Sequence, residues 1–203
     1  MKANKGEWSE PYVALRVLGD GKLNFADDEG NVIPDKWLNV LDVIRYETRE
    51  RVDQRVEYGL SADAIVDIKI DDKEIASVPA HEFLYYADKL KAEILNASGS
   101  SFNVSNDIEK FFEKIQLTAI KAKSIDKSDI FISIEDTQTS VVRRHIGFSI
   151  KSKFGKDPTL FNTGKNSATV YKLSNMNDDL MDEINSMVDE KNHTAVADRC
   201  KII

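Results

Sequence analysis

Asp129-Ile-Phe-Ile-Ser-Ile-Glu135-Asp136 is followed, after a short polar segment, by His145-Ile-Gly-Phe-Ser149-Ile-Lys151-Ser152-Lys153. Both stretches alternate apolar and polar residues, which predicts two half-buried strands over 129–135 and 146–152. The segment between them ends in small polar residues that suit a turn. We therefore expect an antiparallel hairpin at the centre of a mixed α/β protein.

The register of this hairpin follows from its turn, which we expect near Ser140. The numbers of paired residues then sum to about 280, so Asp129 lies opposite Lys151 and Phe131 opposite Ser149. An acid and a lysine at the open end of two apolar strands suit a metal-dependent phosphodiesterase. The alternative is a solvated cross-strand ion pair, which stabilises a sheet by only about 0.2–1 kcal/mol.

Three further stretches resemble one enzyme family. They are Asn4-Lys-Gly-Glu-Trp-Ser-Glu10-Pro-Tyr12, Gly147-Phe-Ser-Ile-Lys151-Ser-Lys-Phe-Gly155 and Thr159-Leu-Phe-Asn162. From about residue 4 to about residue 185 the chain resembles the HpaII-type restriction endonucleases. The resemblance implies a PD-(D/E)xK nuclease, with a mixed sheet flanked by helices. It also implies a type II enzyme that uses Mg²⁺ to cut double-stranded DNA at a short palindrome such as CCGG.

The same resemblance implies the catalytic residues. Asp129 would hold the metal and Lys151 would position or activate water, whereas Ser149 stands where the motif has its middle carboxylate. A serine hydroxyl is a poor ligand for a hard cation. Nucleases of this kind often take an acid from an N-terminal helix, so we expect Glu10 to be the second metal ligand, with Glu7 as the fallback.

The charge of the chain is compatible with DNA binding. The formal net charge is -7, but between residues 110 and 172 lysines and arginines are twice as numerous as acids. Such a basic segment suits contact with phosphates. We expect DNA contacts from Arg143 and Arg144 on the hairpin, and from Lys153, Lys156 and Asn162 in the loop that follows it. Asn162 could read an adenine or contact a phosphate.

Composition narrows the class of protein. A chain of 203 residues with 41% hydrophobic residues can form one catalytic domain over residues 1–203. The single cysteine excludes an internal disulfide and, with no apolar signal segment, favours the cytoplasm. No apolar run approaches the length of a membrane helix. We expect the chain to be the N-terminal portion of a longer protein or a shortened relative.

Two functional classes stay open at this point. The first is the restriction endonuclease, with Mg²⁺ as cofactor, double-stranded DNA as partner and a homodimer as one assembly. The second is a catalytically inactive DNA-binding or assembly module on the same scaffold.

The remaining elements are expected from periodicity and turn signals. A first helix over 9–18 has Ser9 as its cap and Pro11 in its first turn, and it ends at Gly19–Gly21. Strands are expected at 22–25, 31–33, 54–60, 64–70 and 168–173, and helices at 80–95, 106–122 and 178–190. Residues 37–47 fit a helix or a strand. The alternating charges from Arg45 to Glu57 are typical of an exposed face.

Overall fold

The computed structural model describes residues 1–49, 51–121, 128–154, 177–180 and 182. The chain divides into a compact unit, Met1–Thr159, and a second unit, Leu160–Ile203. In the second unit the described residues 178–180 and 182 are helical, as part of the predicted final helix requires. The predicted strand over 168–173 lies outside the described residues. The single domain expected over 1–203 stays a prediction.

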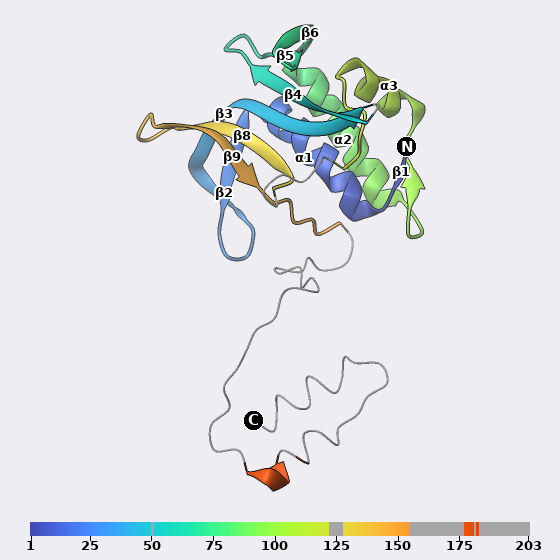
Figure 1. Cartoon of the computed structure of the whole chain (residues 1–203). Helices are drawn as coiled ribbons and strands as arrows, with labels where there is room; N and C mark the ends of the chain where they lie inside the picture. The colour runs from blue at the N-terminus through green and yellow to red at the C-terminus, as the bar shows by residue number, and fades with distance from the viewer. Residues whose placement is uncertain (50, 122–127, 155–176, 181, 183–203) are drawn as a thin grey trace. The chain divides into compact units, whose positions relative to one another are not determined.

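The first unit contains a seven-stranded antiparallel sheet (Figure 1). Its main path runs β6–β5–β4–β3–β8–β9, and β2 pairs with β3 beside this path. The strands are β2 (Lys22–Ala26), β3 (Val32–Arg49), β4 (Val52–Leu60), β5 (Ile65–Ile70), β6 (Lys73–Pro79), β8 (Ile130–Asp136) and β9 (Val142–Phe148). The mixed α/β class is confirmed, and residues 37–47 are strand. Sequence reasoning missed β6, which follows β5 after a turn at Asp71 and Asp72.

Three helices complete the unit: α1 (Lys5–Asp20), α2 (Ala80–Asn96) and α3 (Asn106–Lys114). Figure 1 shows α1 and α2 together on one side of the sheet. Leu15 and Leu90 on the helices are fully buried in one cluster with Val43, Ile68 and Ile132 from the strands. The core therefore lies between the two helices and one face of the sheet. A two-residue pair, β1 (Lys2–Ala3) and β7 (Phe102–Asn103), ties the N-terminus to the segment before α3.

Helix α1 begins four residues earlier than expected, because its cap is Asn4 and not Ser9. The Asn4 side chain accepts the Glu7 amide and the Glu7 carboxylate accepts the Asn4 amide, which forms a capping box. Ser9 lies inside the helix and donates its hydroxyl to the Lys5 carbonyl. Pro11 is also interior. The predicted end is confirmed, since Gly21 is left-handed with φ 62°.

The predicted hairpin forms, but its second strand is Val142–Phe148 and not 146–152, so Ser149 and Lys151 follow the strand. Its register also differs from the prediction. Ile130 pairs with Phe148 and Phe131 with Gly147, so the sums are 278 and Asp129 falls opposite Ser149 and not Lys151. The turn lies earlier than expected, because the Asp136 amide bonds to the Val141 carbonyl. A bulge between Ile132 and Ile134 then adds one residue to β9 and recovers part of the difference.

Two other expectations are wrong. Arg45 and Glu47 lie on the core face of β3 with no exposed side-chain surface, so the alternating charges there do not mark an exposed face. Arg45 donates to the carbonyls of Ala119 and Ile120, and Glu47 accepts the Thr118 amide and hydroxyl. These bonds hold the chain beyond α3, which ends at Lys114 and does not reach residue 122 as predicted.

Candidate active site

Asp129 and Ser149 lie side by side at the open end of the hairpin, where β8 begins and β9 has ended. The Ser149 hydroxyl donates to Asp129 Oδ2 over 3.2 Å, and the Ile150 amide donates to the same oxygen over 2.8 Å. The Asp129 amide in turn donates to the Phe148 carbonyl. These bonds fix the carboxylate at the sheet's end, with one oxygen held by the protein and the other available to a ligand.

Lys151 lies two residues beyond this pair and faces α1. It is exposed, and it lines a cavity of about 370 Å³ together with Ser9, Tyr12 and Val13 from the helix. The ring of Tyr12 meets the ring of Phe154 edge-on, with their centroids 5.3 Å apart. Tyr12 is half-buried and also packs against the hydrophobic core, so its contact with Phe154 ties the segment that carries Lys151 to α1.

Glu10 belongs to the same turns of α1 as these cavity residues and only 8% of its surface is exposed. It is therefore an interior carboxylate and not a residue of the far surface, but it is not among the residues that line the cavity. The fallback residue Glu7 takes part in the capping box. The role of Glu10 as the second metal ligand stays a prediction.

The two candidate ligands approach from different faces of the sheet. Alternation places Asp129 and Phe131 on the face away from the helices, where the Phe131 ring meets Tyr46, whereas Ile130 is in the helix-covered core. A cation that touches both Asp129 and Glu10 must therefore lie beyond Phe148, where the strands end. Within the described part of the chain, no three acids, histidines or cysteines gather as a metal site.

This arrangement still fits a magnesium ion. Mg²⁺ in phosphoryl-transfer enzymes keeps several waters and takes only one or two carboxylates, with phosphate oxygens from the substrate. Asp129 offers a fixed carboxylate at the end of the hairpin, and Glu10 is a buried acid on α1. The pairing of these two acids on one ion stays a prediction.

A second Asp-x-Lys sequence occurs on β5, and sequence reasoning missed it. Asp67-Ile68-Lys69 spells the nuclease motif more fully than Ser149-Ile150-Lys151, and its spelling alone could have revealed it. Asp67 and Lys69 lie on the sheet face without helices, since Ile68 is in the core. Asp67 already accepts the Ser77 hydroxyl over 2.6 Å.

One buried carboxylate lies near this second motif. Asp42 pairs with Gly59, which pairs with Asp67, so the two acids flank a residue without a side chain. Asp42 is 8% exposed, and its Oδ1 has no hydrogen-bond partner among the described residues. The β5 motif is therefore a rival for the catalytic role, and it provides a matched control for tests of Lys151.

The structure describes three of the five residues that we expected to contact DNA. Arg143 and Arg144 are exposed on the edge strand β9, and His145 beside them has φ 52° at the bulge. Lys153 is exposed and reaches the β2–β3 turn, because a Cβ at Gly30 would lie 3.6 Å from its Nζ. Lys156 and Asn162 lie outside the described residues.

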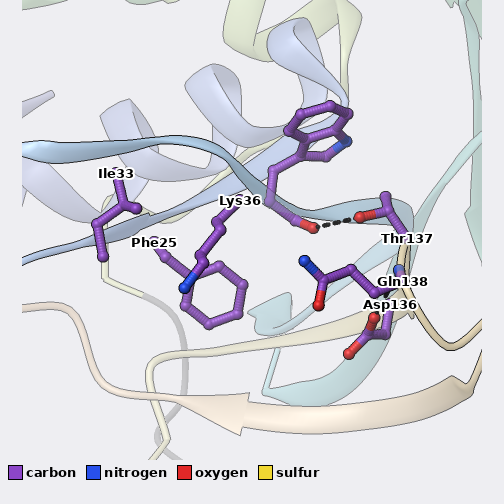
Figure 2. A pocket seen from close by; sticks show the side chains of 7 residues that line it. Phe25, Ile33, Lys36, Asp136, Thr137 and Gln138 are labelled. Carbon is purple, nitrogen blue, oxygen red and sulfur yellow. Dashed lines mark hydrogen bonds between the residues drawn. The ribbon is translucent and has the colours of Figure 1, made fainter.

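Another cavity, of about 280 Å³, lies at the turn end of the hairpin. Figure 2 shows Lys36 beside the Phe25 ring, with Asp136 and Gln138 across from them and Thr137 bonded to a carbonyl of β3. The amides of Gln138 and Thr139 lower the pKa of Asp136. Since β8 spans roughly 20 Å, this cavity cannot share a metal ion with Asp129.

Comparisons with known proteins identify the family of this chain. The sequence profile described as HpaII restriction endonuclease matches residues 4–203. The chain belongs to the HpaII restriction endonuclease family. It is 34% identical over 188 residues to the type II restriction enzyme HpaII of Haemophilus parainfluenzae. The aligned region covers 91% of this chain and 50% of that enzyme. The chain thus spans about half the length of the curated relative it matches. No solved structure matches it.

Proposed function

We propose that this member of the HpaII family is a type II restriction endonuclease that hydrolyses double-stranded DNA at CCGG. The observation that carries the proposal is the hairpin end, where Asp129 is fixed by Ser149 and Ile150 beside a cavity that exposes Lys151 next to α1. Family membership and the similarity to a type II restriction enzyme support it. The scaffold is proposed to be of the PD-(D/E)xK kind.

The chain's own residues have distinct roles in this proposal. Asp129 and Glu10 hold Mg²⁺, and when bound the ion supplies a Lewis acid for the phosphate and its water. Lys151 orients the attacking water and lowers the cost of charge on the phosphate oxygens. Ser149 positions the Asp129 carboxylate through its hydroxyl. Water attacks phosphorus in line, the bond to the 3′ oxygen breaks, and a 5′-phosphate and a 3′-hydroxyl result.

Assembly and location follow as predictions. A palindrome has twofold symmetry, so a homodimer would present one centre to each strand. No helix in the described part of the chain is long and apolar enough to cross a membrane. The cytoplasmic location stays a prediction.

The alternative is an inactive module that binds DNA. It is favoured by one observation, namely that Ser149 stands where the motif carries a carboxylate. A duplex with one CCGG site, incubated with the chain and Mg²⁺, separates the two functions. The endonuclease cuts this duplex to 5′-phosphate ends and leaves a GCGC duplex intact. Binding without cleavage over a range of Mg²⁺ and Mn²⁺ concentrations would establish the inactive module.

A further inference from the structure

The cavity beside Lys151 continues toward the start of α1. A neighbouring cavity of about 640 Å³ is lined by Asn4, Lys5, Gly6, Gly99 and Ser100, and both cavities include Ser152 and Phe154. The two hollows therefore form one surface, here called the α1 groove. It runs from Tyr12 and Lys151, past Phe154, to the first turn of the helix.

The charged side chains that line the α1 groove in the described part of the chain are all cationic. Three lysines line it, namely Lys5, Lys151 and Lys153, and no aspartate or glutamate is among its lining residues in the described part of the chain. Lys5 donates to the Leu95 carbonyl over 3.4 Å, which leaves further ammonium hydrogens for a ligand. In a protein with net charge -7, such a surface attracts an anion selectively.

The helix itself adds to this attraction. The groove passes the first residues of α1, a helix of 16 residues, where the helix dipole and backbone amides favour negative charge. Tyr12 contributes a hydroxyl donor. Burial raises the pKa of Tyr12, although the charge of Arg16 acts the other way, so the hydroxyl keeps its proton at neutral pH.

The length of the groove indicates more than one anionic group. At about 1.5 Å per helical residue, Lys5 lies roughly 10 Å along α1 from Tyr12. One strand of a duplex carries a phosphate for about every 3.4 Å of the duplex axis, so a groove of this length has room for more than one phosphate of the strand. A single inorganic phosphate would fill only one end of the groove.

We propose that the α1 groove holds the sugar–phosphate backbone of one DNA strand as it leaves the cleavage centre. Tyr12 and Lys153 contact the phosphate next to the cleaved one, and Lys5 contacts a phosphate further along the same strand. The inference rests on the proposed function and extends it to residues of α1 that contact neither the metal nor the cleaved bond.

Phosphates made neutral one at a time test this placement without cleavage. Duplexes with one CCGG site carry a single methylphosphonate at successive positions, and their affinities are measured in Ca²⁺ by fluorescence anisotropy. The full chain is compared with Lys5→Gln, Tyr12→Phe and Lys153→Gln. Lys91→Gln, an exposed lysine on α2, is the matched control.

The proposal predicts a position-specific result. Lys5→Gln weakens binding about tenfold and makes the salt slope shallower by about one unit. For Lys5→Gln, a methylphosphonate at one particular position no longer changes the duplex affinity. For Tyr12→Phe and Lys153→Gln, the position without effect is a different one, nearer the cleaved bond. Lys91→Gln behaves as the unaltered chain.

Three outcomes overturn the proposal. If all three groove variants keep the full methylphosphonate profile while the chain still cuts CCGG duplexes, the groove is not the strand path and the proposed function stands. If 10 mM inorganic phosphate removes the effect of methylphosphonates on duplex affinity to the same extent in every variant, the groove binds free phosphate only. If the chain neither binds nor cuts the duplex, the proposed function fails together with this inference.

Discussion

Glu10 is the residue that we propose to join Asp129 on the metal ion. The Asp129 carboxylate is fixed at the hairpin end, where one of its oxygens accepts the Ser149 hydroxyl and the Ile150 amide. Glu10 is buried on α1, the helix that also lines the cavity beside Lys151. Glu7, three residues earlier, serves the helix start instead.

Substitution of these two acids separates the roles. We expect Glu10→Gln to lower Mn²⁺ affinity, measured by isothermal titration in the presence of uncut duplex, by at least tenfold. Glu7→Ala should leave Mn²⁺ affinity unchanged and reduce stability by roughly 0.5–2 kcal/mol, because it removes the side-chain acceptor of the Asn4 amide from the capping box. Equal Mn²⁺ affinity in Glu10→Gln and the unaltered chain would move the second ligand elsewhere.

Contact between helices sets the position of α1, and Gly19 shows how closely it packs. A Cβ at Gly19 would lie 2.7 Å from the Leu84 backbone nitrogen on α2, which is closer than real contacts allow. The placement of the groove and of Glu10 therefore depends on a glycine at this crossing.

Gly19→Ala distinguishes packing from helix propensity. Propensity alone predicts a gain of about 1 kcal/mol, whereas a clash with backbone predicts a loss of about 1–3 kcal/mol. We expect a net loss, seen as a lower urea midpoint. Gly6→Ala is the matched control, since its Cβ would meet only the Asn4 side chain, at 3.2 Å. A Gly19→Ala variant more stable than the unaltered chain would contradict this packing.

The sequence predicted strands well where the alternation of apolar and polar residues determines them. It predicted less well those features that depend on the exact position of one turn. Alternation was enough for β5 and for the central hairpin, because burial of one face is written directly into the residue order. The hairpin register was not, since it depends on where the turn closes and on a bulge at His145 that no residue type announces. The error in the register sum is two residues. Because side chains alternate between the faces with a period of two, Asp129 and Ser149 still share a face.

Tertiary contacts explain the other differences. Arg45 and Glu47 look like surface charges in the sequence, but the loop carbonyls and the amide that they bind come from residues about 70 positions away. The β5 motif was missed because Asp67 and Lys69 fit an ordinary amphipathic strand. The N-terminal helix and Lys151 line one cavity, but Glu10 is not among its lining residues, so its place in the site stays a prediction.

At the scale of the whole molecule, two places in one sheet could carry nuclease chemistry. At the hairpin end, Ser149 and Ile150 hold the Asp129 carboxylate and Lys151 lines the cavity next to α1. The second place is the helix-free face, where Asp67 and Lys69 lie on β5. The proposed function assigns catalysis to the hairpin end, because only there do a fixed carboxylate, an exposed lysine and a cationic groove for a strand come together.

Cleavage by two lysine variants tests this assignment most directly. Rates on a CCGG duplex in Mg²⁺ are measured for Lys151→Ala and Lys69→Ala, with duplex affinity in Ca²⁺ and thermal midpoint measured alongside. We predict that Lys151→Ala loses about 10²–10⁴-fold in cleavage rate, with its midpoint retained and its affinity lowered by no more than about tenfold, whereas Lys69→Ala stays within a few-fold of the unaltered chain. Loss of cleavage in Lys69→Ala with full activity in Lys151→Ala would contradict the account and place the catalytic centre on β5.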